Sequence, residues 1–334
     1  MSHKAKAYIL PFGQGLENVC TEETRTFINE HFDAVWNTSN QPYSHEQMAH
    51  ILEDAEILLS SWGTPKLTPD LLQKASKLRY VGHAAGSVKG CLTKDIFAHD
   101  IKVFSGAPRL ALSVGEYCLT VLLALLRRIP QCSSAVKQGA WWEIPERNQG
   151  HELTGNTIGI VSASSTARAF LQLLAPFKVK VLLYDPYLTE EHAQKLGVQL
   201  ASIEDVMRCP IISIHAPSLP STDNLIHKDL IQSISDGAIL INSSRGSVLD
   251  EDALLKELQT GRFFAALDVF KKEPIIQDSP FTKLDNVLVT PHIAGHSVEC
   301  FKALMLEIAQ DIQRSSHNEP TRYEIYERMW EVLA

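Results

Sequence analysis

Short apolar runs alternate with helix-like patterns along most of the chain, and this alternation constrains the fold more than any other feature. Strands that are joined through helices lie parallel, with the helices covering both faces of the sheet. The runs that predict strands are Ala5–Leu10, Ile57–Ser60, Leu78–Gly82, Ile101–Ser105, Thr157–Ser162, Val179–Tyr184, Ile211–His215, Ala238–Asn242, Phe263–Leu267 and Val287–Thr290. The sequence therefore predicts an α/β protein with mostly parallel sheets.

The helical patterns divide the chain into two α/β units. The predicted helices are Thr21–His31, Ser44–Glu53, Pro69–Ala75, Leu110–Ile129, Ser165–Leu174, Glu251–Thr260 and Val298–Arg314. The alternation pauses after residue 105 and restarts at residue 157, across a polar and aromatic stretch, Gln138–Asn156, that we interpret as a surface connection. We place the boundary near residue 106 and expect the last helix to return to the first unit.

The charge balance excludes some classes of function. The chain carries 31 Lys and Arg against 39 Asp and Glu, a net charge of −8. Nucleic acids and anionic membranes attract basic surfaces, so we expect neither as a partner. The most apolar stretch, Leu110–Ile129, contains Glu116, Arg127 and Arg128 and indicates a buried helix rather than a membrane span.

The ends of the chain and its cysteines favour a cytoplasmic protein. Only four consecutive apolar residues follow the first charges, fewer than a signal-peptide core needs. The six cysteines are scattered, without a CxxC pair or a cluster with metal-ligand spacing, which predicts reduced thiols and no metal site.

The segment from Thr157 to Asp185 has the parts of a dinucleotide-binding unit: a strand, a tight turn, a helix, a second strand and an acidic residue. Asp185 would accept hydrogen bonds from the adenosine ribose and repel a 2′-phosphate, which favours NAD over NADP. The turn, Ser162–Ala167, contains none of the usual glycines. Ser164 places a side chain where a backbone must approach the pyrophosphate, and Ser162 must adopt the strained turn conformation.

Two interpretations of this turn remain open. The hydroxyls of Ser164, Ser165 and Thr166 could bond a phosphate at the helix N-terminus, where free N–H groups and the positive end of the helix dipole lie. Alternatively, the serines only cap a helix that binds nothing.

Three later segments carry the motifs with the most chemistry: Asn242–Glu251, Leu267–Pro274 and Thr290–Gly295. With His83–Val88, Val114–Tyr117, Leu153–Gly159 and His215–Pro217, they resemble the D-isomer-specific 2-hydroxyacid dehydrogenase family. The resemblance implies a flavodoxin-like substrate domain (1–105), a Rossmann-type dinucleotide-binding domain (106–297) and a C-terminal helix that returns to the first domain (298–334). It also implies a homodimer, to which the long helix around residues 114–127 contributes.

The resemblance makes Arg245, Glu273 and His292 the catalytic set, and chemistry supports the choice. Reduction of a 2-keto acid needs a proton on oxygen, which a histidine can deliver near neutral pH. A carboxylate beside the histidine favours the imidazolium, and a guanidinium can hold the substrate carboxylate. Taken singly, Arg245 could be a surface ion-pair donor and Glu273 an exposed turn residue. The His292–His296 pair lacks a third ligand for zinc.

The resemblance also assigns binding residues. Those expected near the nicotinamide and its ribose are Ala216, Ser243, Ser244, Asp268 and Gly295. Asp268 could equally cap local backbone. In the first domain, Ala85, Gly86 and Ser87 form a loop whose N–H groups could bind the substrate carboxylate, or a simple strand-to-helix turn. The Trp62–Pro65 turn either faces the cleft or packs, and Leu110 stands near the place where the family usually has Asn.

The sequence is compatible with two functions. The first is an NAD-dependent oxidoreductase that interconverts a small D-2-hydroxy acid and its 2-keto acid, with His292 as acid and base. The second is a non-catalytic member of the family, a ligand-binding or scaffolding homodimer with impaired NAD binding. The complete Arg/Glu/His set supports the first, and the missing glycines together with Leu110 support the second.

Overall fold

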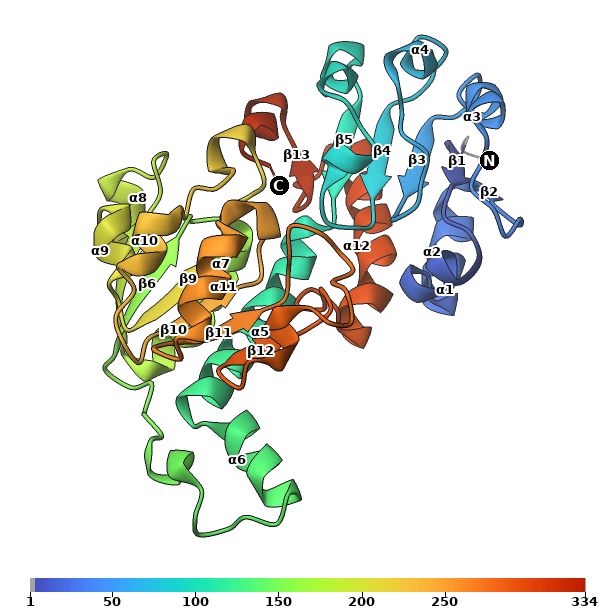
Figure 1. Ribbon diagram of the computed structural model, residues 1–334. Helices are drawn as coiled ribbons and strands as arrows, with labels where there is room; N and C mark the ends of the chain where they lie inside the picture. The colour runs from blue at the N-terminus through green and yellow to red at the C-terminus, as the bar shows by residue number, and fades with distance from the viewer. Residues whose placement is uncertain (1–3, 334) are drawn as a thin grey trace. The chain divides into compact units, whose positions relative to one another are not determined.

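The computed structural model describes residues 4–333, which form two compact units (Figure 1). Unit 1 comprises the residues up to Leu110 and those from His296 onward, and unit 2 comprises Ala111–Gly295. Each unit is built on its own sheet, of six strands in unit 1 and seven in unit 2. The predicted α/β class with two parallel-sheet units is confirmed.

The sheet of unit 1 has the order β13-β5-β4-β3-β1-β2. All pairs are parallel except β13 with β5, so the parallel part has the strand order of flavodoxin-like folds. The strands are β1 (Lys6–Ile9), β2 (Asp33–Trp36), β3 (Ile57–Ser60), β4 (Tyr80–His83), β5 (Lys102–Ser105) and β13 (Glu324–Ile325). The helices are α1 (Gly13–Val19), α2 (Glu22–His31), α3 (His45–Ile51), α4 (Pro69–Leu72) and α12 (Val298–Ser316), with 3₁₀ turns η1 (Val88–Gly90), η2 (Lys94–His99) and η8 (Glu327–Val332).

Two strands of unit 1 were not predicted, and both lie at sheet edges. β2 begins with Asp33 and is only partly buried, while β13 has two residues. Neither offers the apolar run by which buried strands are recognised. The turn that leads into β13 is fixed by Asp311 of α12, a fully buried carboxylate that accepts the N–H groups of Arg322 and Tyr323, both at 2.7 Å.

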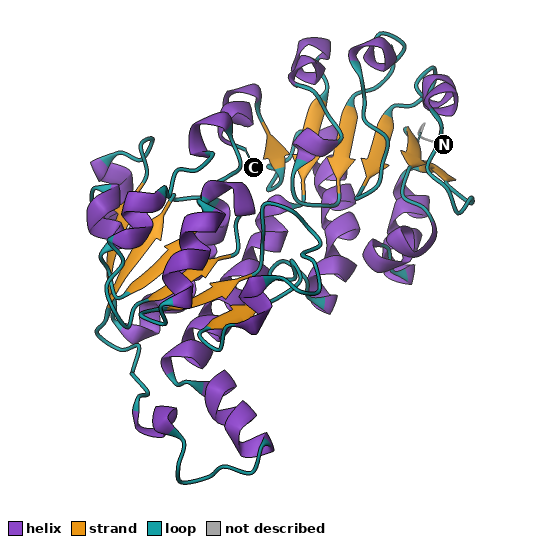
Figure 2. Cartoon of the chain, in the orientation of Figure 1, coloured by secondary structure: helices purple, strands orange, loops and turns teal. Residues whose placement is uncertain are grey.

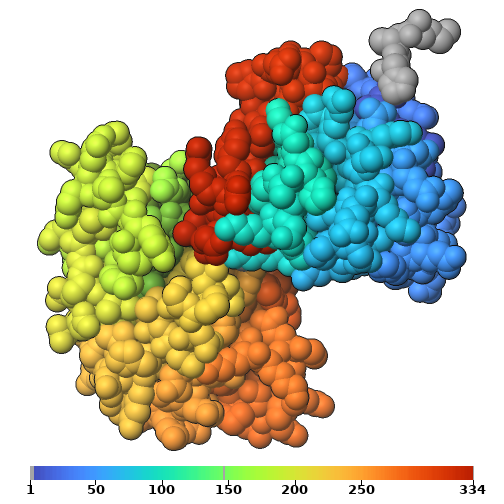
Figure 3. Space-filling view, turned by 90° about the horizontal axis from the view of Figure 1, so that it is seen from above, coloured from blue at the N-terminus to red at the C-terminus, as the bar shows by residue number. Residues whose placement is uncertain are grey.

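The C-terminal helix and the segment after it belong to unit 1. α12 crosses the sheet so closely at Gly82 that an added Cβ would lie 2.4 Å from the side chain of Ile308. Beyond β13, η8 packs on η2, where the rings of Trp330 and Phe97 lie 5.8 Å apart. Figure 3 shows this C-terminal segment, in red, against neighbouring residues of the same unit.

Unit 2 has the strand order β12-β11-β10-β9-β6-β7-β8, and every pair is parallel. This is the Rossmann order with one more strand, and the order reverses between β6 and β9, where such folds bind ligands. The strands are β6 (Thr157–Val161), β7 (Lys180–Tyr184), β8 (Gln199–Leu200), β9 (Ile211–Ile214), β10 (Ile239–Asn242), β11 (Phe264–Leu267) and β12 (Val287–Val289). The helices are α5 (Ala107–Leu126), α6 (Ile129–Lys137), α7 (Ser165–Leu174), α8 (Glu190–Leu196), α9 (Ile203–Met207), α10 (Lys228–Gln232) and α11 (Glu251–Gln259). The 3₁₀ turns are η3 (Pro145–Asn148), η4 (Ala175–Phe177), η5 (Pro220–Thr222), η6 (Gly246–Val248) and η7 (Pro280–Lys283).

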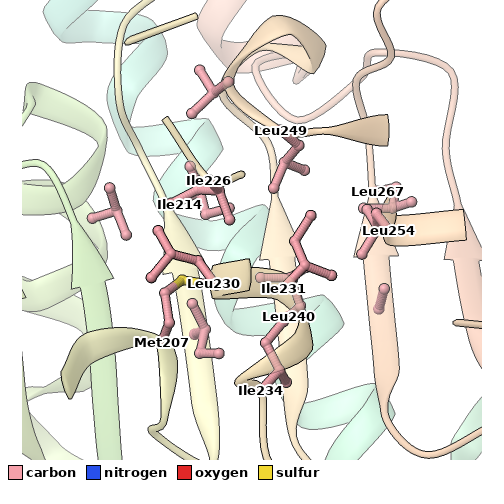
Figure 4. Packing of buried hydrophobic residues seen from close by; sticks show 14 of the residues in the cluster. Met207, Ile214, Ile226, Leu230, Ile231, Ile234, Leu240, Leu249, Leu254 and Leu267 are labelled. Atoms are coloured by element: carbon pink, nitrogen blue, oxygen red, sulfur yellow. The ribbon is translucent and has the colours of Figure 1, made fainter. Parts of the chain in front are cut away.

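Helices cover both faces of the unit 2 sheet (Figure 2). Successive strand residues point to opposite faces, so Leu240 packs with α9, α10 and α11 whereas its neighbours Ile239 and Ile241 pack with α5 and α7. Figure 4 shows the first of these layers, in which Met207 and Leu230 from the helices lie near Ile214 and Leu240 of the sheet, and Leu254 of α11 lies beside Leu267 of β11. The double layer fixes the strand ends that carry the polar residues described below.

The long apolar helix forms, but it ends earlier than predicted. α5 stops at Leu126, and Arg128, with a left-handed φ of 53°, turns the chain into α6. Within the described residues, α5 is the one helix that is long and apolar enough to cross a membrane, and half of it is buried inside the protein. Its residues Cys118, Leu122 and Leu125 have no exposed surface, as expected for a core helix.

Candidate functional site

His292 and Glu273 form the central pair of the site. Nδ1 of His292 lies 2.6 Å from Oε2 of Glu273, and the other carboxylate oxygen, Oε1, accepts the N–H of Phe270 at 2.9 Å. Burial alone would raise the pKa of Glu273. The hydrogen bonds from His292 and Phe270, with the charges of His292 and Arg245, outweigh burial and lower that pKa. Glu273 is therefore a carboxylate near neutral pH, and Nε2 is the imidazole nitrogen that can serve a substrate.

The turn that carries His292, residues 290–294, is built around Asp268. This carboxylate follows β11 and is 1% exposed. Oδ1 accepts the Thr290 hydroxyl at 2.6 Å and the Ile293 N–H at 2.8 Å, and Oδ2 accepts the Ala294 N–H at 2.8 Å. His292 itself has a left-handed φ of 54°, which a residue with a side chain seldom adopts. Asp268 thus fixes a strained backbone that aims the imidazole.

Arg245 enters the same site from the end of β10. Asn242, fully buried, anchors the segment: its Oδ1 accepts the N–H of Ser244 and its Nδ2 donates to the carbonyl of Arg245. Nη1 of Arg245 donates to the Ser244 carbonyl at 2.7 Å, which leaves further guanidinium N–H groups for a ligand. Burial lowers the pKa of Arg245, while the charge of Glu273 opposes this shift.

A cavity of about 240 Å³ joins these three side chains. Its other lining residues are Gly246, Ser247, Phe270 and Lys271. At Gly246 the chain passes so close to the segment after β11 that a Cβ would lie 1.9 Å from the carbonyl carbon of Phe270 and 2.2 Å from the nitrogen of Lys271. This backbone contact fixes the spacing between the segments that carry Arg245 and Glu273. The predicted catalytic residues are therefore brought together.

The cofactor turn, Ser162–Ala167, has the geometry of a dinucleotide loop without its glycines. Ser162 has a left-handed φ of 75°, as the tight turn requires. Both backbone polar groups of the next residue, Ala163, are bonded: Asp185 Oδ2 accepts its N–H at 2.8 Å, and Arg168 Nε donates to its carbonyl at 2.9 Å. Asp185 therefore closes the turn as well as standing at the end of β7, where a ribose-binding acid is expected.

A chain of hydrogen bonds runs from this turn into the core. Ser164 caps α7 by accepting the Ala167 N–H, and its Oγ lies 2.9 Å from Oγ1 of Thr166. Thr166 Oγ1 lies 3.1 Å from Nδ1 of His215, whose Nε2 lies 2.9 Å from Oγ of Ser213. Burial lowers the pKa of His215 to about 3, so its ring is neutral. No sequence motif indicates this contact, which arises because the β6–β9 pairing places His215 directly beside the turn.

The other predicted binding residues of unit 2 lie at the same strand ends. Ala216 and Ser243 are buried, and Ser243 Oγ lies 3.2 Å from Sγ of Cys118, whose thiol pKa burial raises to about 12. Ser244 is bonded to Asn242, and Gly295 closes unit 2 after the His292 turn. Of the two roles considered for Asp268, the structure displays the local backbone contacts; the expected nicotinamide contact stays a prediction.

The predicted substrate loop, Ala85–Ser87, lies in unit 1 after β4. Its flanking and internal carbonyls are bonded from the interior: Ser61 donates to Ala84 at 2.9 Å and Ser105 donates to Gly86 at 3.1 Å. Carbonyls that turn inward leave the peptide N–H groups of a loop facing the other way. The carboxylate-binding role stays a prediction. Within residues 4–333, no group of three or more His, Cys, Asp or Glu side chains is placed to hold a metal ion.

Comparison with known proteins places this site in context. Residues 119–294 match the family model described as "D-isomer specific 2-hydroxyacid dehydrogenase, NAD binding domain". The D-3-phosphoglycerate dehydrogenase of Methanocaldococcus jannaschii is 32% identical over 274 residues, which are 80% of this chain and 51% of that protein. This chain thus spans about half the length of the curated relatives that it matches.

Solved structures share the fold over nearly the whole chain. A protein from Pyrococcus horikoshii superposes with a TM-score of 0.81 at 19% identity, covering 98% of this chain and 97% of that one. A phosphoglycerate oxidoreductase from Rhizobium etli gives 0.80 at 23% identity, with 97% and 99% covered. The match of the sequence to an NAD-binding domain identifies NAD(H) as the cofactor.

Proposed function

Because the chain belongs to the D-isomer-specific 2-hydroxyacid dehydrogenase family, we propose that it interconverts a small D-2-hydroxy acid and its 2-keto acid with NAD(H). The observation that carries the proposal is the cavity in which Arg245, Glu273 and His292 converge. A non-catalytic scaffold would not need a histidine bonded to a carboxylate beside a guanidinium. The complete set therefore favours the enzyme over the non-catalytic alternative.

The residues of the cavity divide the chemistry among them. The nicotinamide cofactor supplies the hydride for reduction and accepts it in the reverse direction. His292 delivers a proton from Nε2 to the carbonyl oxygen as the alcohol forms, and takes it back during oxidation. Glu273 holds Nδ1, which fixes the ring orientation and stabilises the imidazolium. Arg245 binds the substrate carboxylate or polarises the carbonyl through its fixed, permanent charge.

The residues at the ends of β6 and β7 fit the cofactor. The turn presents the first N–H groups of α7 where a pyrophosphate would lie. In the absence of glycines, the hydroxyls of Ser164, Ser165 and Thr166 would supply further hydrogen bonds to the phosphate oxygens. Asp185 would hold the adenosine ribose and disfavour a 2′-phosphate, so NAD rather than NADP is proposed. In the substrate domain, the loop Ala85–Ser87 is proposed to bind the carboxylate.

We also propose a cytoplasmic homodimer. Four large apolar side chains of α6 and its following loop are exposed: Ile129, Val136, Trp141 and Trp142. A second copy that covers them would remove a large apolar surface from water. No disulfide joins the six cysteines, which all lie within the described residues, and this fits a reducing compartment. Sedimentation of the wild type and of W141A/W142A would test the assembly, because a dimer through this surface dissociates in the variant.

The enzyme is tested by titrating NADH and assaying 2-keto acid reduction in the wild type, H292Q and D185R. H292Q should lose about 10²- to 10⁴-fold in kcat without a change in NADH affinity. D185R should weaken NADH binding because it replaces the ribose acceptor. The exposed His227, which N-caps α10, provides the matched control H227Q. Failure of the wild type to bind NADH saturably at millimolar concentration would refute the proposal.

A further inference from the structure

We propose that Trp62, held by its contact with Phe301, forms a recognition surface in unit 1 for a bulky apolar side chain on the 2-keto acid, an aryl group above all. The inference rests on the proposed function, since it presumes that the loop Ala85–Ser87 holds the substrate carboxylate. It goes further by naming the class of acid. It also separates this chain from relatives that are named for a phosphorylated acid.

The sheet of unit 1 places Trp62 beside the predicted substrate loop. β3 and β4 are adjacent and parallel, and Ser60 is paired with His83 at their carboxyl ends. The next residues stay together, because the hydroxyl of Ser61 donates to the carbonyl of Ala84. Trp62 and Ala85 therefore follow the carboxyl ends of two neighbouring strands, side by side. A carboxylate bound by the loop would lie within reach of the indole.

The surroundings of this edge are apolar. Trp62 is 47% exposed, and its ring meets Phe301 of α12 edge-on, with centroids 5.3 Å apart. This contact holds the indole in place and leaves much of it in contact with solvent. Leu110 supports the loop from the core: it is 9% exposed, and its Cδ1 lies 3.6 Å from the Cβ position of Gly86. A ligand side chain that packs on the exposed indole would bury aromatic surface.

Two cations near the loop, Arg109 and Lys89, are engaged elsewhere, which argues against a second anionic group on the substrate. Nε of Arg109, next to Leu110, lies 3.5 Å from the Glu307 carboxylate. Nζ of Lys89, just beyond the loop, donates to the Leu333 carbonyl at 2.7 Å. Recognition of a phosphate group requires Arg or Lys side chains that are not already paired with other groups. Lys66, exposed on the same turn as Trp62, is the cation through which a phosphate could still be recognised.

The test compares kcat/KM for phenylpyruvate, pyruvate and 3-phosphohydroxypyruvate with NADH in the wild type, W62A and K66A. Phenylpyruvate should be the best substrate, and W62A should lower its kcat/KM by about 10- to 100-fold, mainly through KM. Pyruvate, which lacks the side chain, should change by less than about 3-fold by the same reasoning. H227Q, at an exposed residue of unit 2, should behave as the wild type.

Two results would overturn the inference while leaving the proposed function intact. One is a preference for 3-phosphohydroxypyruvate that K66A abolishes. The other is an equal loss for pyruvate and phenylpyruvate in W62A. If no acid is reduced at all, the proposed function fails. Calorimetric binding of phenylpyruvate then decides the inference separately: affinity lost in W62A supports the recognition surface, and equal affinity in both proteins refutes it.

Discussion

Two turns of unit 2 place a residue with a side chain in the left-handed region, Ser162 in the cofactor turn and His292 in the catalytic turn. A carboxylate from the end of a neighbouring strand holds each. Asp268, almost wholly buried, accepts three hydrogen bonds of 2.6–2.8 Å from the catalytic turn. The half-buried Asp185 accepts the Ala163 N–H at 2.8 Å and, at 3.4 Å, the Ser162 hydroxyl. Both carboxylates therefore hold a turn with a left-handed residue, but Asp268 holds its turn more firmly than Asp185 does.

The difference shows where rigidity is needed. A non-glycine residue in this conformation costs about 1–2 kcal/mol, which surrounding bonds must offset. A catalytic imidazole must be held within a fraction of an ångström of its working position. A cofactor turn tolerates more freedom, because the cofactor itself can order it.

The largest effect is expected when the buried carboxylate loses its charge. D268N replaces an acceptor oxygen by an N–H₂ group that faces N–H donors, so the catalytic turn should open. We expect kcat to fall by about 10²-fold or more, from misplacement of His292, and the unfolding free energy to fall by roughly 3 kcal/mol. D311N, at the buried carboxylate of α12, should destabilise comparably but keep its turnover. Equal turnover loss in both variants would contradict a specific role for Asp268.

Acid should act through the histidine behind the cofactor turn. Burial holds the pKa of His215 at about 3 and that of His83, in unit 1, at about 4, below their ordinary value of 6.5. The unfolded chain takes up these protons below about pH 6.5 and the native protein does not. The unfolding free energy should therefore be highest above about pH 6.5 and fall by a few kcal/mol as the pH approaches 4.

The dependence of the unfolding free energy on pH separates the contribution of His215 from that of His83. In H215N the pH dependence should be reduced to the part due to His83, whereas H227N, at an exposed position, should follow the wild type. Chemical denaturation at a series of pH values measures this slope. An unchanged slope in H215N would show that His215 is already protonated in the native protein.

A smaller effect is expected when the cofactor turn loses its link to the core. T166V removes the hydroxyl between Ser164 and His215 with little change in volume. NADH affinity should fall by about 2- to 10-fold, the value of one hydrogen bond, while the NADH-saturated kcat stays unchanged. Fluorescence titration measures the affinity. A loss of kcat instead would mean that the two turns are coupled.

The smallest effect should be a gain. S162G relieves the left-handed strain at the cofactor turn, so the unfolding free energy should rise by about 1 kcal/mol. A163G, one residue on and outside that region, should instead lose about 0.5–1 kcal/mol. Thermal unfolding separates the two. A destabilised S162G would show that the Ser162 side chain contributes more than its backbone costs.

The catalytic residues could be predicted from the sequence because their positions depend on the ends of parallel strands. Arg245, Glu273 and His292 are far apart in the chain, but each lies near the carboxyl end of a parallel strand, and such ends share one edge. The hydrogen bonds from the catalytic turn to Asp268 depend on the direction of its side chain, which a sequence pattern does not specify. The sequence therefore leaves open whether Asp268 lies near the nicotinamide or caps local backbone. The Thr166–His215 contact required the neighbour of β6, which the order of residues alone does not reveal.

The peptide contact at Gly246 has a practical consequence for anyone who wishes to redirect this protein to other acids. Main chain touches main chain there, so a substitution cannot widen or narrow the gap between guanidinium and carboxylate without rebuilding both segments. Mutant libraries should therefore leave that junction untouched and randomise the turn around Trp62. The reaction would then be inherited intact, and only the choice of acid would be open to change.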